Sequence, residues 1–225
     1  MLLLALDTST AAVTVALLDD GGACAHLAQL DARRHAELLA PQIVEVLEGC
    51  GASVADLTGV AVGVGPGPFT GLRVGITTAA VLAWAAQVPV HGVCSLDAIA
   101  QGVLAREGDA APAELVVATD ARRREVYWAP YRLAEHGYVR TAHPAVSAAA
   151  DVTRSGAPVA GRGAQLYAES LGPALDPLEV DAADLAQVAV RALDGRAPGT
   201  LLPLEPLYLR RPDAVEPAGR KRVLQ

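Results

Sequence analysis

The chain opens with three short apolar stretches separated by polar turns. The stretches are Leu2–Asp7, Val13–Leu18 and Cys24–Leu30, and each has the length of a strand. The sequence Asp-Asp-Gly-Gly at positions 19–22 is typical of a tight hairpin turn. The pattern therefore predicts a three-stranded meander at the start of the chain.

A helix is predicted next, over Arg34–Cys50, because apolar residues recur there at helical spacing. Its main apolar face consists of Ala36, Leu39, Ala40, Ile43, Val46 and Leu47. The opposite face carries glutamates but is interrupted by Leu38, Pro41 and Val44. Since a helix that covers one sheet needs only one apolar stripe, this second apolar side predicts a further packing partner. Pro41 is expected to kink the helix, because its ring removes a backbone donor.

The next segment alternates apolar strands with helices. Strands are predicted at Val60–Val64 and Val88–Cys94, and helices at Leu72–Ala86 and Leu96–Arg106. A glycine-rich loop, Gly63–Gly71, joins the first of these strands to its helix. Residues 1–107 thus have the predicted order β-β-β-α-β-α-β-α and form an N-terminal lobe.

A charged break at Glu107–Ala113 precedes a second meander, so a boundary is predicted at residue 108. The elements predicted after it are strands Leu115–Thr119, Glu125–Tyr131, Tyr138–Thr141 and Pro158–Ala160, and helices Ala164–Ser170 and Ala182–Leu193. They form a smaller C-terminal lobe over residues 108–210. The proline-rich stretch from Pro198 is expected to be extended, and residues 211–225 to form a tail.

An aspartate ends the first strand of each meander, Asp7 in one and Asp120 in the other. Two successive β-β-β-α units of this kind predict an α/β protein of two ribonuclease-H-like lobes. This duplicated, actin-like (ASKHA) architecture is that of actin, sugar kinases and the Hsp70 ATPase.

Composition narrows the classes of function. The 225 residues are 52% hydrophobic and include 25 acidic and 18 basic side chains, a formal net charge of −7. Such a chain can bury a large core, and its net field does not attract nucleic acid. No apolar run reaches the roughly 18 residues of a membrane span. The N-terminus lacks the basic start of a signal peptide, so a cytoplasmic protein is expected.

Metal and nucleophile motifs are missing from the sequence. The unevenly spaced Cys24, Cys50 and Cys94 form no CxxC pair, which favours buried, reduced thiols over a disulfide framework or a zinc site. The five histidines form no HxxxH or HExxH motif, and no serine lies in a GxSxG setting. His35 opens the first predicted helix, where we expect a structural or interface role.

Two candidate phosphate sites leave alternatives open. The glycine-rich loop can offer backbone N–H groups to an anion, but Pro66 and Pro68 each remove one, so a stiff turn is the other interpretation. In actin-like ATPases, acids at the positions of Asp7 and Asp120 organise magnesium and a catalytic water. Neither acid has a neighbouring glycine here, and an aspartate that caps a turn fits equally.

Two further features also have two interpretations each. The basic run Arg122–Arg124, close to Tyr127 and Trp128, can meet RNA or form a solvated turn. Small residues share one side of the helix that follows the glycine-rich loop: Gly71, Gly75 and Thr78–Ala79. Such spacing lets another backbone come close, so these residues either pack on the sheet or form a docking face for a second helix.

The run Gly65-Pro-Gly-Pro-Phe-Thr-Gly-Leu-Arg-Val-Gly75 resembles the GPGSFTGLRIG segment of the TsaB family, also called YeaZ. Four other segments resemble landmarks of that family in the same order: Ala5–Ser9, His35–Pro41, Asp120–Trp128 and Pro206–Arg210. Together they span nearly the whole chain. Pro68 stands where the family commonly has serine, and Ala80-Val81 stand where it commonly has Lys-Gly. These departures lie on the glycine-rich loop and the following helix, and they remove polar side chains that could make a contact there.

The resemblance implies a bacterial subunit of the complex that makes N6-threonylcarbamoyladenosine beside the tRNA anticodon. Such a subunit has no complete active site, and therefore no catalytic, cofactor-binding or metal-binding residues of its own. It binds the paralogue TsaD, which carries a metal through an HxxxH motif and transfers the threonylcarbamoyl group. The ATPase TsaE joins the pair, and tRNA is reached through the complex. An isolated subunit can pair with itself when its partner is missing.

The first two helices of the N-terminal lobe form the TsaD contact in that family. The residues of this sequence expected there are Leu38, Pro41, Val44, Glu45, Arg73, Gly75, Ile76, Ala79 and Ala80. The alternative function is a stand-alone actin-like ATPase or small-molecule kinase, which would hold magnesium-ATP at Asp7, Thr8, Ser9 and Asp120. A third interpretation, a metal-dependent peptidase, lacks its ligand motif.

Overall fold

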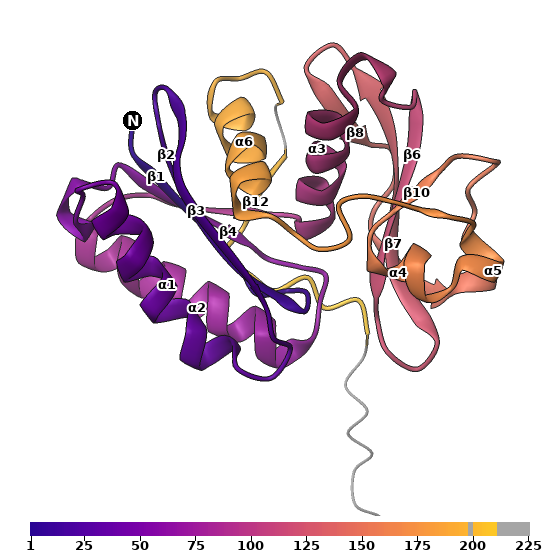
Figure 1. Cartoon of the computed structure of the whole chain (residues 1–225), viewed down its shortest axis with the longest axis horizontal. Helices are drawn as coiled ribbons and strands as arrows, with labels where there is room; N and C mark the ends of the chain where they lie inside the picture. Colours follow the sequence, from indigo (N-terminus) through magenta and orange to yellow (C-terminus); the bar gives the residue numbers. More distant parts are fainter. Residues whose placement is uncertain (198–199, 211–225) are drawn as a thin grey trace, which may run out of the picture.

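The computed structural model describes residues 1–197 and 200–210, which form two sheets with helices around and between them (Figure 1). The first sheet has the strand order β12-β5-β4-β1-β2-β3. The second has the order β11-β10-β6-β7-β8, with β9 paired to β7. Each sheet begins with an antiparallel meander that parallel strands extend. The predicted α/β fold of two ribonuclease-H-like, actin-like lobes is confirmed.

The first sheet is covered on both faces. Its strands are β1 (Leu3–Asp7), β2 (Ala12–Asp19), β3 (Gly22–Leu30), β4 (Gly59–Gly63), β5 (Val90–Val93) and β12 (Leu201–Leu202). Successive side chains of β1 point to opposite sides, so Leu4 and Leu6 lie in one apolar cluster and Leu3 and Ala5 in another. Helices α1 (His35–Gly49) and α2 (Phe69–Ala86) cover the outer side, and α6 (Ala182–Leu193) packs on the inner side (Figure 1).

The second sheet has smaller helices around it. Its strands are β6 (Glu114–Asp120), β7 (Glu125–Ala134), β8 (Gly137–Arg140), β9 (Ala145–Ala148), β10 (Val159–Ala160) and β11 (Ala174–Leu175). Helices α4 (Arg162–Leu166) and α5 (Ala168–Leu171) lie beside it. Short 3-10 turns occupy Val54–Asp56, Gly108–Ala110 and Ala149–Asp151.

Helix α3 (Ser95–Glu107) joins the two lobes, because it packs against α6 on one side and β6 and β8 on the other (Figure 1). A buried polar cluster fixes it there. The carboxylate of Asp97 accepts hydrogen bonds from the Tyr131 hydroxyl at 2.7 Å and from Arg140 at 2.9 Å. Burial raises the pKa of Asp97, although Arg140 and Tyr131 counteract the shift. The lobes therefore share one continuous interior.

The chain does not divide at a single point. The sheets change between α3 and β6, close to the predicted boundary at residue 108. However, β12 pairs with β5 of the first sheet, and α6 packs on β1 and β2. The C-terminal part of the predicted 108–210 lobe therefore returns to the first lobe. The predicted tail over 211–225 and Pro198 lie outside the described residues.

Differences from the predicted elements are confined to short segments. The helix predicted over Ala164–Ser170 is two helices that meet at Tyr167. Helix α2 begins earlier than predicted, at Phe69. Strands β9, β11 and β12, of two to four residues each, were not predicted.

Two of the three cysteines are paired, which corrects the expectation of buried, reduced thiols. Cys24 on β3 and Cys50 at the end of α1 form a disulfide across a sequence separation of 26. Cys24 is exposed, and only Cys94 is both buried and free among the described cysteines. The spacing of the cysteines hides this proximity, because α1 runs back along the strand that carries Cys24.

By length and composition alone, helix α2 resembles a membrane span: it has 18 residues with a mean hydropathy of 1.3. No other helix in the described ranges meets those two criteria. In the fold, Leu72, Ile76, Ala79 and Ala83 of this helix pack on the first sheet. The apolar residues on one side of α2 are therefore part of the core, and those on the other side form an apolar surface.

Candidate functional site

Asp7, at the end of β1, is enclosed rather than open to a ligand. Its side chain is fully buried, and its Oδ1 accepts hydrogen bonds at 2.7 Å from both the backbone N–H and the hydroxyl of Ser9. Its Oδ2 accepts one from the Ser95 hydroxyl at 2.6 Å. Burial raises the pKa of Asp7, and the bonds from Ser95 and Ser9 offset part of that. Both oxygens thus hold the strand end in place.

The glycine-rich loop packs directly against this strand end. A Cβ at Gly63 would overlap the Asp7 carboxylate, and one at Gly67 would overlap the carbonyl of Ser9. Residues Gly63 to Gly67 are all buried. Of the two interpretations of the loop, the geometry supports the tight, proline-stiffened turn, since close packing rather than an open anion cradle explains the glycines.

The small residues of α2 also face inward. A Cβ at Gly71 would overlap the carbonyl of Thr8, and one at Gly75 would lie 2.5 Å from its hydroxyl oxygen. That hydroxyl donates a hydrogen bond at 2.7 Å to the carbonyl of Gly71. Ala79 is fully buried. These residues allow α2 to approach β1, which is the packing role left open by the sequence.

A cleft of about 510 Å³ lies between the lobes. It brings together Thr8, Ser9 and Asp120, three of the four residues of the predicted ATP site, but Asp7 does not line it. Asp120 accepts a hydrogen bond from the N–H of Arg122 at 2.8 Å and pairs with its guanidinium at 3.1 Å. Asp120 thus caps its turn.

Asp7 does not fit the role of a magnesium ligand in this arrangement. A metal needs free carboxylate oxygens, and those of Asp7 are already engaged in a buried network. The first 197 residues together with 200–210 contain no cluster of three or more His, Cys, Asp or Glu side chains that suits a metal ion. His35 points its Nε2–H at the carbonyl of Thr10 at 2.9 Å, a structural role at the start of α1.

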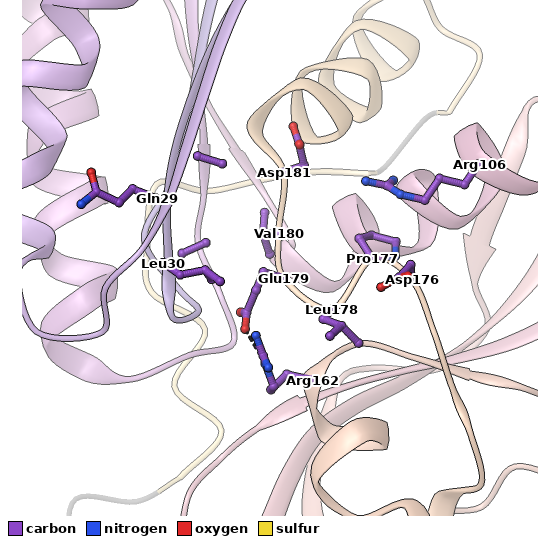
Figure 2. Close-up of a pocket in the computed structure, with 12 residues that line it drawn as sticks. Gln29, Leu30, Arg106, Arg162, Asp176, Pro177, Leu178, Glu179, Val180 and Asp181 are labelled. Carbon is purple, nitrogen blue, oxygen red and sulfur yellow. Dashed lines mark hydrogen bonds and ion pairs between the residues drawn. The ribbon is translucent and has the colours of Figure 1, made fainter.

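A second hollow, of about 410 Å³, lies between the edge strand β3 and the segment 176–181, whose side chains are drawn in Figure 2. Four of its charged side chains already have partners: Arg106, Arg162, Glu179 and Asp181. Arg162 donates to Glu179 at 2.7 Å, and the other oxygen of Glu179 accepts from the N–H of Ala11 at 3.3 Å. Segment 176–181 therefore braces the first lobe against α4.

The outer face of α1 and α2 carries the predicted docking residues in three environments. Pro41, Val44, Glu45 and Arg73 are exposed, and Leu38 and Ala80 are half-buried. Gly75, Ile76 and Ala79 are buried in the chain itself and offer no surface as the fold stands. Sequence reasoning assigned them to the surface because α2 is apolar almost all round, so its outward side was ambiguous.

Two residues of this face were missed. Trp84 is 76% exposed and Val81 is 58% exposed, although both are large and apolar. They follow the exposed Thr77 at positions i+4 and i+7 and therefore share its side of the helix. That spacing was the available signal. Together with Val44 and Pro41 of the adjacent α1, they form an apolar surface that we call the outer helix face.

Comparison with known proteins gives consistent matches. A family model described as "TsaD: tRNA N6-adenosine threonylcarbamoyltransferase" matches residues 22–190. An uncharacterized protein of Mycobacterium tuberculosis is 44% identical over 214 residues, or 94% of this chain and 92% of that protein. The tRNA threonylcarbamoyladenosine biosynthesis protein TsaB of Escherichia coli is 42% identical over 137 residues, 61% of this chain and 58% of that protein.

The solved structure of YeaZ from Pseudomonas aeruginosa is 34% identical to this chain. It aligns with a TM-score of 0.81 over 92% of this chain and 99% of that one. The similarity thus extends through both lobes and agrees with the signature run at residues 65–75 and with the TsaB-named relatives. The chain belongs to the TsaB (YeaZ) family.

Proposed function

We propose that this chain is a non-catalytic subunit of the complex that makes N6-threonylcarbamoyladenosine in tRNA. It binds and supports a TsaD-like catalytic paralogue through the outer helix face. The relatives named for tRNA threonylcarbamoyladenosine biosynthesis support the pathway. The observation that carries the docking role is the exposure of Val44, Val81 and Trp84 on two adjacent helices.

An exposed apolar surface of this kind costs solvation free energy unless a partner covers it. Trp84 has the properties of an interface anchor, because a large aromatic side chain buries much area and loses little conformational entropy. The helices beneath it are held rigidly, since Leu39 and Ile43 of α1 and Leu72 of α2 are buried in the same core. The surface is therefore preformed, which reduces the ordering cost of binding.

The border of the outer helix face is mostly acidic. Glu37, Glu45 and Glu48 of α1 are exposed, and Arg73 is the basic residue on the facing side of α2. We therefore expect the partner to present an apolar centre bordered by basic side chains. Such complementarity mainly accelerates association and selects the partner.

The remaining partners follow from the same proposal. A TsaE-like ATPase joins the pair, tRNA is reached through the complex, and the chain acts in the cytoplasm. Without its paralogue, the chain pairs with a second copy through the same apolar surface. The enclosed carboxylate of Asp7 supports a subunit without a complete active site, because its oxygens stabilise the fold.

The test is to mix the purified chain with the TsaD paralogue of the same organism and measure the mass by size-exclusion chromatography with light scattering. A stoichiometric heterodimer is the expected result. Two separate peaks at micromolar concentration would contradict the docking role. Calorimetry with magnesium-ATP on the isolated chain tests the alternative, a stand-alone ATPase or kinase. Micromolar binding lost in Asp120→Asn would support that alternative.

A further inference from the structure

An exposed aromatic stack lies at the start of α2. The rings of Phe69 and Tyr208 are stacked with centroids 5.3 Å apart, and the side chains are 51% and 46% exposed. The guanidinium of Arg73 lies over the Phe69 ring, 3.9 Å from its centroid. Both faces of Phe69 thus have neighbours. Tyr208 comes from the C-terminal segment, which crosses from the first lobe toward the second (Figure 1).

The turn between β6 and β7 presents three consecutive arginines to solvent. Arg122, Arg123 and Arg124 are exposed, and all three have left-handed backbones, with φ of 62°, 56° and 63°. Residues other than glycine rarely adopt this backbone conformation. Three such residues in succession cost conformational free energy, which points to a functional role for the turn. Arg122 pairs with Asp120, whereas no acidic partner of Arg124 occurs among the described residues.

The C-terminal segment brings the stack and the turn together. Arg210, two residues after Tyr208, forms an ion pair and hydrogen bond with Glu125, the residue that follows Arg124. Arg122 also lines the lobe cleft together with Arg33 and with Thr70, the neighbour of Phe69. The aromatic stack, the arginine turn and the cleft mouth therefore make one surface, which we call the arginine–aromatic surface.

This surface is basic on an acidic protein. Its arginines are Arg33, Arg73, Arg122, Arg123, Arg124, Arg162 and Arg210. The described acids beside them include Asp31, Asp120, Glu125 and Glu179. The chain as a whole carries a formal charge of −7, so the local excess of positive charge is opposite to the overall balance. Long-range attraction of a polyanion is weak here, but phosphates at contact distance meet mainly guanidinium groups.

We propose that the arginine–aromatic surface binds single-stranded RNA directly. A base stacks on the open side of Tyr208, and the arginines of the β6–β7 turn contact successive phosphates. Stacking platforms beside basic residues bind single strands in this way, with little sequence preference. The choice of RNA over DNA rests on the proposed function.

The aromatic stack and the Val81–Trp84 part of the outer helix face lie at opposite ends of α2, and Arg73 borders both surfaces. Phe69 opens the helix and Trp84 lies close to its end, roughly 22 Å apart at 1.5 Å per residue. A partner centred on Val81 and Trp84 therefore leaves Tyr208 and the arginine turn accessible. RNA and paralogue can be held at the same time, and each contact can be tested without the other.

The experiment uses fluorescence anisotropy with the full chain and a fluorescein-labelled, mixed-sequence single-stranded RNA of about 12 nucleotides. We expect saturable binding at low salt that weakens as salt rises. Arg122→Ala combined with Arg124→Ala should lower the affinity at least fivefold and reduce the salt slope by about 1.4, since each phosphate contact contributes about 0.7. Tyr208→Ala should lower the affinity about tenfold through lost stacking.

The matched control is Arg132→Ala combined with Arg196→Ala, which removes the same charge from exposed arginines elsewhere. It should bind RNA almost as well as the parent. Equal losses in the two double variants, or no loss in Arg122→Ala/Arg124→Ala, would overturn the proposal and assign the binding to other basic groups. Displacement of the RNA by polyglutamate at equal charge concentration would show a protein-type acidic ligand instead. Light scattering with the paralogue is unaffected by these variants, so failure here is distinct from failure of the docking role.

Discussion

Ser95 donates a hydrogen bond to the carboxylate of Asp7 at 2.6 Å, joining the start of α3 to the end of β1 across 88 positions of sequence. The same Ser95 oxygen accepts from the N–H of Gly65 at 3.1 Å. Three segments of the first lobe therefore meet at one buried carboxylate. An acid in the place where actin-like enzymes use one for chemistry is here a structural junction.

Replacing Asp7 tests this junction. Asp7→Ala should lower the free energy of unfolding by about 3 kcal/mol, because it leaves the buried hydroxyls of Ser9 and Ser95 and a backbone N–H without their acceptor. Asp7→Asn keeps an acceptor oxygen and should cost less. Urea denaturation measures both. A variant of Asp7 as stable as the parent would show that the network contributes little. Since Asp7→Ala changes the fold, Asp120→Asn is the cleaner probe of nucleotide binding.

A charge placed on the outer helix face should block the paralogue. Val81→Glu should weaken the heterodimer at least tenfold, because docking would bury a carboxylate without a partner. Trp84→Ala should weaken it as well through lost buried area. Isothermal titration with the TsaD paralogue gives the affinities.

Val139→Glu is the matched control for that measurement. Val139 lies on β8 of the other lobe and is 54% exposed, close to the 58% of Val81. The same substitution there should leave both the affinity and the thermal unfolding midpoint unchanged. Equal binding by Val81→Glu and the parent would place the docking surface elsewhere.

The ion pair between His26 and Asp181 should make stability depend on pH. Nε2 of His26 lies 2.9 Å from Oδ2 of Asp181, and that hydrogen bond raises the pKa of His26, with Asp184 adding to it and burial opposing it. The folded-state pKa therefore exceeds the unfolded value of about 6.5. The stabilisation is fully present below that unfolded value and is lost as the pH rises through the folded-state pKa.

The measurement compares the parent with His26→Gln by urea denaturation from about pH 5.5 to about pH 8.5, a window that brackets the usual histidine pKa. The parent should lead at the acidic end, and its advantage should disappear toward the alkaline end. We expect less than about 1 kcal/mol, since the His26 side chain is 41% exposed and solvent screens the pair. If the free energy of unfolding of the parent and of His26→Gln varied with pH in the same way, the ion pair would not contribute to the pH dependence.

Reduction of the disulfide between Cys24 and Cys50 should destabilise the first lobe. A crosslink across 26 positions lowers the entropy of the unfolded chain, which stabilises the fold by about 3.5 kcal/mol in the chain-entropy model. Denaturation with and without dithiothreitol should differ by an amount of this order, and Cys24→Ser should remove the difference. If Cys24 and Cys50 both reacted with a thiol reagent in the protein without dithiothreitol, the pairing would be contradicted.

Cys94 supplies the internal control. Burial raises the pKa of its thiol well above the usual range, so little reactive thiolate forms. In the oxidised, folded protein, thiol reagents should therefore find no rapidly reacting group. After denaturation, mass spectrometry should detect one modified cysteine, at position 94.

The longer elements were predictable because each carries its own period. Helices such as α6 (Ala182–Leu193) repeat a pattern long enough to recognise, and strands such as β2 (Ala12–Asp19) form long apolar runs. Strands β11 and β12 have two residues each, and only their neighbours make them strands. Their positions depend on tertiary contacts, which no local pattern contains.

The candidate site was predictable only in part for a related reason. The first two helices were predicted, but α2 is apolar on nearly all sides, so its sequence did not reveal which side points outward. Ala79 consequently appeared as a surface residue and Trp84 did not. The burial of Asp7 was equally hidden, because its partner Ser95 lies far away in sequence.

Strand β12 and helix α6 also determine the order in which the protein can be completed during synthesis. When residues 1–107 have left the ribosome, the outer edge of β5 is unpaired and the inner side of the first sheet is uncovered, because both partners lie beyond residue 181. Contacts of such long sequence separation form late and slowly. The first lobe therefore becomes a finished structure only after the second has been made, and a nascent chain that ends between them has an open sheet.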